Sequence, residues 1–164
     1  MRVLGVVGWS GAGKTTLIAG VLPYLVAAGM RVSTVKHAHE GFDLDRPGKD
    51  SWRHRAAGAG EVMLAGARRW ALLHEVEGEE PGLEELIGRL APCDLVLVEG
   101  WKGHPYPKIE VYRRALGKAA LWPEMAGVMA VASDGAVVGC PVPVLALDEP
   151  ALVAAWIRAM GHKG

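Results

Sequence analysis

The chain has 164 residues, of which 51% are apolar and 22% are charged. This length and composition are typical of a compact α/β protein, and we expect a single domain over residues 1–164. The 18 basic residues balance the 18 acidic residues, so no overall electrostatic field attracts a nucleic acid or a membrane. We therefore expect neither of these as a partner.

The cysteines and the N-terminal residues indicate the cellular compartment. Cys93 and Cys140 are far apart and form no CxxC pattern, which favours free thiols in a reducing cytosol over a disulfide or a zinc site. The apolar run MRVLGVVGW is too short for a signal peptide or a membrane span and leads into a glycine-rich turn. We expect a cytoplasmic protein.

The N-terminal part of the chain is predicted to form a βαβ unit. A β-branched run predicts a strand over residues 2–7, and a mostly apolar pattern predicts a helix over residues 15–28 with Gly29 as its C-terminal cap. Pro23 lies inside this pattern and is expected to kink or split the helix. A second strand is predicted over residues 31–35.

The rest of the chain continues the alternation of strands and helices. Helices are predicted over residues 51–60 and 83–90, and Asp148 is predicted to cap a last helix that has Pro150 in its first turn. The remaining strands are predicted over residues 61–65, 69–74, 95–98, 108–112, 128–132 and 144–147. This alternation predicts a doubly wound, mainly parallel sheet with helices on both faces.

A phosphate-binding motif lies between the first strand and the first helix. Residues 8–15, GWSGAGKT, fit the pattern GxxxxGK[ST], in which glycines let backbone N–H groups surround a phosphate at a helix N-terminus. Lys14 is predicted to bridge the outer phosphates, Thr15 to ligate Mg²⁺ and Thr16 to contact the innermost phosphate. The motif predicts a nucleotide site on a P-loop NTPase-like fold, and the alternative is a glycine-rich turn without a ligand. The nucleotide-binding candidates are Trp9, Ser10, Gly11, Ala12, Gly13, Lys14, Thr15 and Thr16.

The apolar strand within DLVLVEG, residues 94–100, ends in an acidic residue and resembles a Walker B strand. Glu99 is predicted to hold Mg²⁺ through water, and the alternative is a structural role, since buried strands often end in Glu-Gly. Asp94 lies at the start of the strand, at the edge of the sheet where ligands do not bind, and is predicted to be structural.

The segment HAHEGFDLDRPGKDSWRHR, residues 37–55, is too highly charged to form a core. It follows a strand and therefore emerges at the carboxyl edge of the sheet, where ligands bind in open α/β folds. Asp43 and Asp45 are candidates for binding Mg²⁺ or for polarising an attacking water. The candidates for a second anion are Lys36, His37, Lys49, Arg53 and Arg55.

Simpler interpretations of this segment stay open. In one interpretation, the whole segment is an ordinary solvated loop, and Lys49 and Arg55 carry only surface charge. His37 and His39 are spaced to bind a transition metal, but no third ligand is evident. Asp50 or Ser51 is predicted to cap the helix that follows.

The segments WSGAGKTT, VKHAH, DLDRPGKDSWRHRAAGA, RRWAL, LVLVEGWK and AVASD, in this order, closely resemble the molybdopterin-guanine dinucleotide biosynthesis protein B family, MobB. The resemblance runs over nearly the whole chain, and its specific part is RPGKDS with the basic helix after it. It implies a homodimeric, Mg²⁺-dependent GTP-binding protein with weak GTPase activity. Such a protein assists the guanylyltransferase, MobA, that joins GMP to molybdopterin.

The candidate residues named above fit such a protein. Hydrolysis would depend on Lys14, Asp45 and Glu99, and the metal candidates are Thr15, Asp43, Asp45 and Glu99. A protein that handles GTP beside a phosphorylated pterin needs a second anion site. The candidates for this pterin-phosphate site are Lys36, His37, Lys49 and Arg53.

The residues that select guanine are less apparent, because the chain has no [NT]KxD motif. Asp134 follows a predicted strand and is the candidate for accepting hydrogen bonds from guanine, while a turn-forming role before Gly135 is the alternative. Trp9 and Trp101 are expected to border the site and to shield it.

Two other functions remain as alternatives. One is a small-molecule kinase or an ATP-dependent ligase, for which residues 113–118 are a short, arginine-containing lid candidate. The other is an adaptor that binds nucleotide without hydrolysing it. Hydrolysis of GTP compared with ATP, with and without a pterin acceptor, distinguishes these functions.

Overall fold

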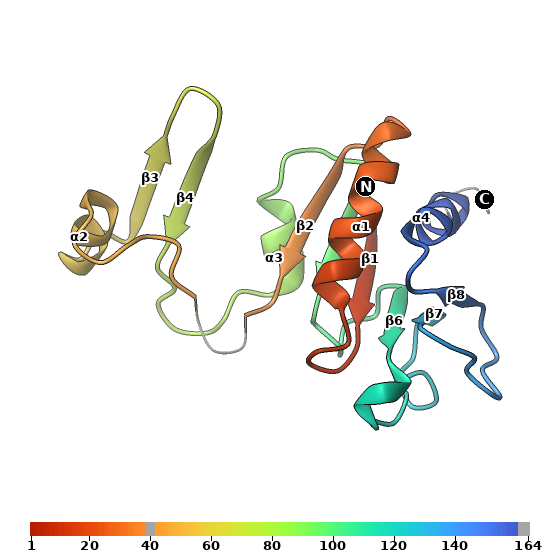
Figure 1. Ribbon diagram of the computed structural model, residues 1–164. Helices are drawn as coiled ribbons and strands as arrows, with labels where there is room; N and C mark the ends of the chain where they lie inside the picture. The colour runs from red at the N-terminus through yellow and green to blue at the C-terminus, as the bar shows by residue number, and fades with distance from the viewer. Residues whose placement is uncertain (39–41, 161–164) are drawn as a thin grey trace. The chain divides into compact units, whose positions relative to one another are not determined.

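Figure 1 presents the computed structural model, which describes residues 1–38 and 42–160. The chain divides into two compact units. Unit 1 consists of Met1–His37 and Leu86–Gly164, and unit 2 consists of Ala38–Glu85. Each unit is described by itself, and a single domain over residues 1–164 stays a prediction.

Unit 1 is built on a six-stranded sheet in the order β2-β5-β1-β6-β7-β8, in which every pair of neighbours is parallel. The strands are β1 (Arg2–Val7), β2 (Val32–Lys36), β5 (Leu95–Glu99), β6 (Lys108–Tyr112), β7 (Val128–Ser133) and β8 (Val144–Ala146). Each of them begins and ends within one residue of its predicted bounds. Apolar β-branched runs between glycines, prolines and charged residues explain this agreement.

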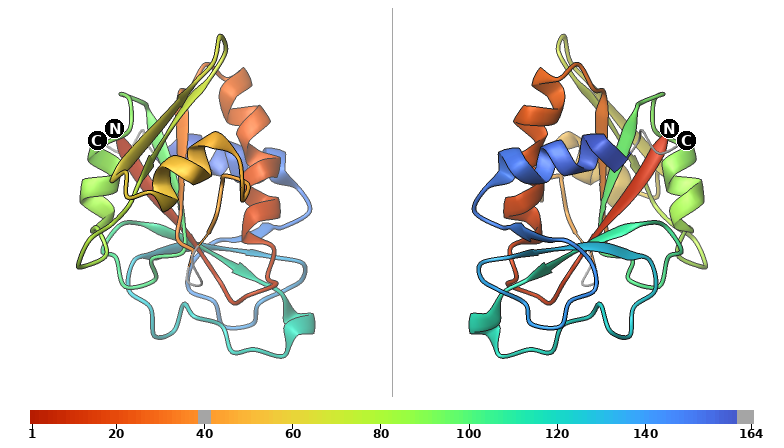
Figure 2. Two further views of the ribbon diagram at one scale, coloured as in Figure 1. Left: turned by 90° about the vertical axis from the view of Figure 1, so that its left-hand side faces the viewer. Right: turned by 90° about the vertical axis from the view of Figure 1, so that its right-hand side faces the viewer.

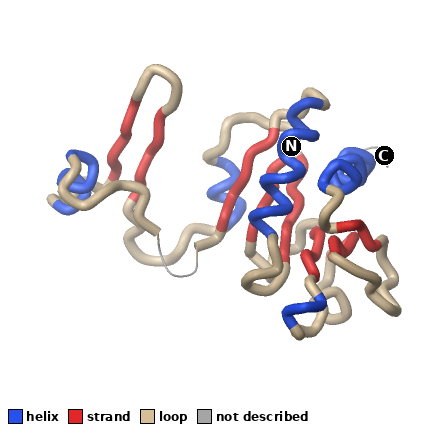
Figure 3. Tube along the Cα trace, in the orientation of Figure 1, coloured by secondary structure: helices blue, strands red, loops and turns tan. Residues whose placement is uncertain are grey.

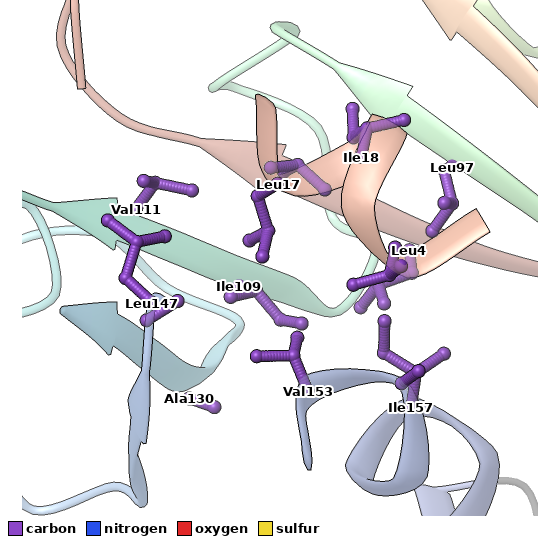
Figure 4. Packing of buried hydrophobic residues seen from close by; sticks show 14 of the residues in the cluster. Leu4, Leu17, Ile18, Leu97, Ile109, Val111, Ala130, Leu147, Val153 and Ile157 are labelled. Carbon is purple, nitrogen blue, oxygen red and sulfur yellow. The ribbon is translucent and has the colours of Figure 1, made fainter. Parts of the chain in front are cut away.

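Alternate residues of the strands point to opposite faces of the sheet. Leu4, Leu97, Ile109 and Ala130 point to the face that is covered by α1 (Lys14–Ala27) and α4 (Pro150–Ala159), and together they form the main core (Figure 4). Residues between them, such as Val96 and Val98, are equally buried and point to the other face. A sheet buried on both faces requires this nearly continuous apolar sequence.

The helices lie on both sides of this sheet. Figure 2 shows α1 and α4 together on one face and α3 (Leu83–Gly88), which belongs to unit 1 from Leu86 onward, on the other. Near β6, the second face is covered by irregular chain instead. Glu110 there accepts hydrogen bonds from the N–H groups of Leu121 and Trp122, at 2.7 and 2.8 Å. The predicted doubly wound α/β fold is therefore confirmed.

Two predictions about the helices are wrong. The predicted split of α1 at Pro23 is one of them: α1 is one helix over Lys14–Ala27, because buried Val21 and Leu25 pack this turn into the core and outweigh the lost hydrogen bond, whereas the predicted kink stays untested. Asp148 does not cap α4, whose N-cap is Glu149 without a side-chain hydrogen bond.

Unit 2 contains α2 (Asp50–Ala56) and an antiparallel hairpin of β3 (Glu61–Ala65) and β4 (Trp70–His74), drawn as two red strands in Figure 3. The hairpin confirms the two strands predicted around a glycine-containing turn. The helix ends four residues earlier than predicted, followed by Gly58 at φ +101°. Its N-cap is Lys49 without a side-chain hydrogen bond, so the predicted cap at Asp50 or Ser51 is wrong.

Within the described ranges, no helix has the length and apolar character that a membrane span needs.

Candidate functional site

The loop of residues 8–13 connects β1 to α1 at the carboxyl edge of the sheet (Figure 1). Two of its glycines are required by the geometry. A Cβ on Gly8 would lie 2.5 Å from the carbonyl oxygen of Val111, and Gly13, the N-cap of α1, has φ +101°. The backbone can therefore form the tight turn that a phosphate-binding loop needs.

Lys14 folds back across this loop. Its Nζ donates to the carbonyl oxygens of Gly8 and Trp9, at 3.1 and 3.0 Å. Burial lowers the pKa of the Lys14 ammonium, and the charges of Lys102 and Lys36 act in the same direction while Glu99 opposes them. A phosphate in the loop would relieve this repulsion between cations.

The hydroxyl of Thr15 and the carboxylate of Glu99 lie side by side. Thr15 Oγ1 donates to Glu99 Oε1 at 2.7 Å, and the Nζ of Lys36 is 3.7 Å from the same oxygen. Strand register explains this meeting, because Glu99 pairs with Val6 on one side and with Lys36 on the other. The structure thus brings together two predicted metal ligands and one predicted anion-binding residue.

A hydroxyl and a carboxylate are the oxygen ligands that Mg²⁺ prefers, and Mg²⁺ keeps several waters and phosphate oxygens as its other ligands. The Thr15–Glu99 pair therefore fits Mg²⁺ as one side of its coordination sphere. No group of three or more His, Cys, Asp or Glu side chains with metal-binding geometry occurs among the described residues.

Arg113 is absent from the residues predicted for the GTP site and enters the sequence analysis only in the lid candidate of the kinase alternative. Its Nε donates to the carbonyl oxygen of Ala12 at 2.9 Å, and its Nη1 is 3.4 Å from Asp134 Oδ2. Arg113 therefore connects the phosphate loop to the residue predicted to recognise guanine. Its position directly after β6, at the carboxyl edge of the sheet, is the signal that would have indicated it.

Of the two tryptophans predicted to border the site, Trp9 belongs to the loop and Trp101 follows β5 at the same edge of the sheet. The indole Nε1 of Trp9 donates to the carbonyl oxygen of Ala119 at 2.8 Å, and Lys102 Nζ is 4.4 Å from the centre of its ring. Trp101 contacts His37, with ring centres 4.4 Å apart. His39 lies outside the described residues, so the His37–His39 metal interpretation stays untested.

Asp43 and Asp45 belong to unit 2, where both pair with Arg55. The Nη2 of Arg55 is 2.8 Å from Asp43 Oδ1 and 2.9 Å from Asp45 Oδ1, and its Nη1 is 3.5 Å from Glu75. The Asp45 side chain is only 4% exposed. Arg55 is thus held by carboxylates in this structure, and the metal roles of Asp43 and Asp45 stay predictions.

Lys49 lines a cavity of about 590 Å³ that lies wholly within unit 2, whereas Arg53 is not among the residues that line it. The cavity is also lined by two further cations, Arg46 and Arg69, and by the exposed ring of Trp70. Cations suit a bound anion, and an aromatic ring suits stacking against another ring. The two predicted second-anion residues of this unit are therefore not equivalent.

The comparisons with known proteins agree with the resemblance seen in the sequence. The family model described as "Molybdopterin guanine dinucleotide synthesis protein B" matches residues 3–134. The chain belongs to the MobB family. A crystal structure of a MobB homolog from Bacillus stearothermophilus is 28% identical, has a TM-score of 0.75, and the match covers 98% of this chain and 97% of that one.

Curated MobB relatives are more similar in sequence. The molybdopterin-guanine dinucleotide biosynthesis adapter protein of Haemophilus influenzae is 43% identical over 71% of this chain. The protein of the same name from Escherichia coli is 42% identical over 70% of this chain. The matched regions span 66% and 67% of these two relatives, about two thirds of their length.

Proposed function

We propose that the protein binds GTP with Mg²⁺ at residues 8–15 and is an accessory protein in the formation of molybdopterin guanine dinucleotide. The hydrogen bond of 2.7 Å between Thr15 and Glu99, at the start of α1, carries the proposal. It joins the hydroxyl of the phosphate loop to the acidic end of β5. The names of the curated relatives support the biosynthetic role.

In this proposal the backbone of the loop and Lys14 hold the phosphates, and Thr15 and Glu99 hold Mg²⁺ on one side. Bound Mg²⁺ would neutralise charge on the phosphates and orient them. Asp134, held by Arg113, accepts the hydrogen bonds of guanine. Asp45 is the proposed group that polarises water in a weak hydrolysis.

A phosphorylated pterin supplies the second anion in this proposal. Lys36 and His37 are its candidates in unit 1, and Lys49 and Arg53 are its candidates in unit 2. The expected protein partner is a guanylyltransferase that joins GMP to molybdopterin.

We also propose a cytoplasmic homodimer. A two-stranded hairpin is marginally stable alone in water, and β3 and β4 expose Met63, Trp70 and Leu72. A second copy of the chain would cover such side chains. Cys93 and Cys140 are free thiols, which suits a reducing compartment.

The experiment that tests the function measures the products formed from GTP and from ATP, with and without molybdopterin and the guanylyltransferase. We expect slow release of phosphate from GTP, little from ATP, and faster formation of the dinucleotide when this protein is added. Transfer of a phosphoryl group to the pterin would instead support the kinase alternative. Unchanged dinucleotide formation would contradict the accessory role.

A further inference from the structure

A strained turn follows β5 directly after Glu99. A Cβ on Gly100 would lie 2.9 Å from the Cβ of His37, so the close approach requires glycine at this position. Trp101 has φ +45° and is the one non-glycine residue with positive φ among the residues that the structure describes. A bulky side chain rarely adopts this conformation, and such strain is concentrated at functional sites.

The turn places Lys102 against the phosphate loop. Contact of the Trp101 ring with His37 holds one side of the turn, and the next residue, Lys102, has its Nζ 4.4 Å from the centre of the Trp9 ring. Trp9 is itself held by its hydrogen bond to Ala119. The turn is therefore held at Trp101, and the ammonium of Lys102 is held at the ring of Trp9.

Lys102 differs from the other cations near the phosphate loop in what its side chain contacts. Lys36 faces Glu99, and Arg113 contacts both Ala12 and Asp134. Lys102 is exposed, forms no salt bridge with the residues that the structure describes, and rests on an aromatic face. The positive charge of Lys102 also repels that of Lys14. Two mutually repelling cations beside one loop are favourable when a multiply charged anion lies between them.

We propose that Lys102 is a second lysine for the terminal phosphate of a nucleoside triphosphate in the loop. This inference rests on the proposed function. A charge-assisted hydrogen bond to a phosphate oxygen is stronger than contact of an exposed ammonium with an aromatic face, so Lys102 moves from Trp9 to the phosphate.

The test compares the affinities for GTP and GDP, measured by isothermal titration calorimetry with Mg²⁺, in the wild type and in Lys102→Met. Methionine keeps an apolar stem against Trp9 and removes the charge. Lys118→Met is the matched control, because the Nζ of Lys118 is 5.9 Å from the centre of the same ring. Lys102→Arg restores a cation.

We expect Lys102→Met to weaken GTP binding by roughly 10-fold or more, as for a lost charged hydrogen bond, and to leave GDP binding nearly unchanged. Lys118→Met should keep the wild-type ratio of GTP affinity to GDP affinity. Lys102→Arg should restore most of the GTP affinity that Lys102→Met loses. If Lys102→Met loses affinity equally for GTP and GDP, or loses none, the inference is overturned. The proposed function still stands in that case, provided that the wild type binds GTP. A wild type that binds neither nucleotide would overturn both.

Discussion

Asp134 is a residue whose role depends on one neighbour. Its carboxylate is 34% exposed and lies 3.4 Å from Nη1 of Arg113, which also holds the carbonyl oxygen of Ala12. The ion pair orients the carboxylate without fully burying it, so acceptor capacity remains for a ligand. Asp134 is thereby linked to the phosphate loop through a single side chain.

Asp134→Asn should reduce the preference for GTP over ATP. An amide offers one acceptor oxygen where the carboxylate offers two, and losing a charged hydrogen bond costs about 1.5–3 kcal/mol, or roughly 10- to 100-fold. Competition binding with both nucleotides measures the change. Unaltered selectivity would place base recognition on other groups.

Asp45→Asn should slow Mg²⁺-dependent GTP hydrolysis more than it weakens GTP binding, because the loop backbone supplies much of the affinity. Asp43→Asn is tested in parallel as the competing candidate, since both carboxylates contact Arg55 Nη2 but the Asp43 side chain is 66% exposed and that of Asp45 only 4%. Steady-state phosphate release and calorimetry separate the two effects. Small, equal effects of Asp45→Asn on both would limit Asp45 to pairing with Arg55.

At the scale of elements, β6 carries two buried polar side chains that face away from the main core. Lys108 and Glu110 are buried there, while Ile109 and Val111 between them belong to the core cluster. Lys108 donates to backbone carbonyls, including those of Tyr106 and Ala126. These buried polar groups hold irregular chain on the sheet where no helix covers it.

Glu110→Gln should destabilise unit 1 by about 1–3 kcal/mol, because a buried amide leaves one of the two backbone N–H groups of Leu121 and Trp122 without its acceptor. Urea unfolding followed by tryptophan fluorescence measures this. A variant as stable as the wild type would show that the carboxylate is not needed to hold this segment.

Glu110→Gln should also change how the free energy of unfolding depends on pH. Burial raises the pKa of Glu110 above its ordinary value, so the folded state binds the proton more tightly than the unfolded state. Its contribution to stability is then fully present below the unfolded pKa and is lost as the pH rises through the folded pKa. Glu110→Gln should remove this loss from the pH profile of unfolding free energy.

The second-anion proposal is tested at α2 of unit 2, which carries Arg53 and has Lys49 as its N-cap. Replacing Lys49 and Arg53 together with alanine should spare GTP affinity and impair the stimulation of guanylyl transfer to molybdopterin. Because Lys49 lines the cavity and Arg53 does not, Lys49→Ala should account for most of the effect. Normal stimulation by the double variant would contradict the proposal, and loss of GTP binding would show that this segment contacts the nucleotide itself.

For the whole molecule, the strands and the phosphate loop could be predicted because they depend on local sequence. Apolar runs bounded by glycine, proline and charge mark β1 and β5, and the spacing in residues 8–15 marks the loop. The order of the six strands could not be derived in this way, because it depends on which crossover each helix makes.

The rest of the site depends on contacts between distant parts of the chain. Arg113 reaches Ala12 because β6 pairs with β1, and Lys102 reaches Trp9 through a strained turn that no composition rule indicates. The cap of α4 was predicted at Asp148 from residue preference alone, whereas the helix begins one residue later. Arg55 was predicted as an anion-binding or surface residue, and its pairing with Asp45 depends on how the segment between them folds back.

The central claim is that this member of the MobB family binds GTP at the loop of residues 8–15. Isothermal titration calorimetry with GTP and Mg²⁺, on the wild type and on Lys14→Ala, tests it most directly. Within the described part of the chain, the hydrogen bonds that the Lys14 ammonium donates go to carbonyl oxygens of its own loop, so its loss should leave the fold intact by circular dichroism and thermal melting. We predict that the wild type binds GTP and that Lys14→Ala weakens binding by about 100-fold or more, as for a lost lysine–phosphate contact. A folded Lys14→Ala variant that binds GTP within a few-fold of the wild type would contradict the account.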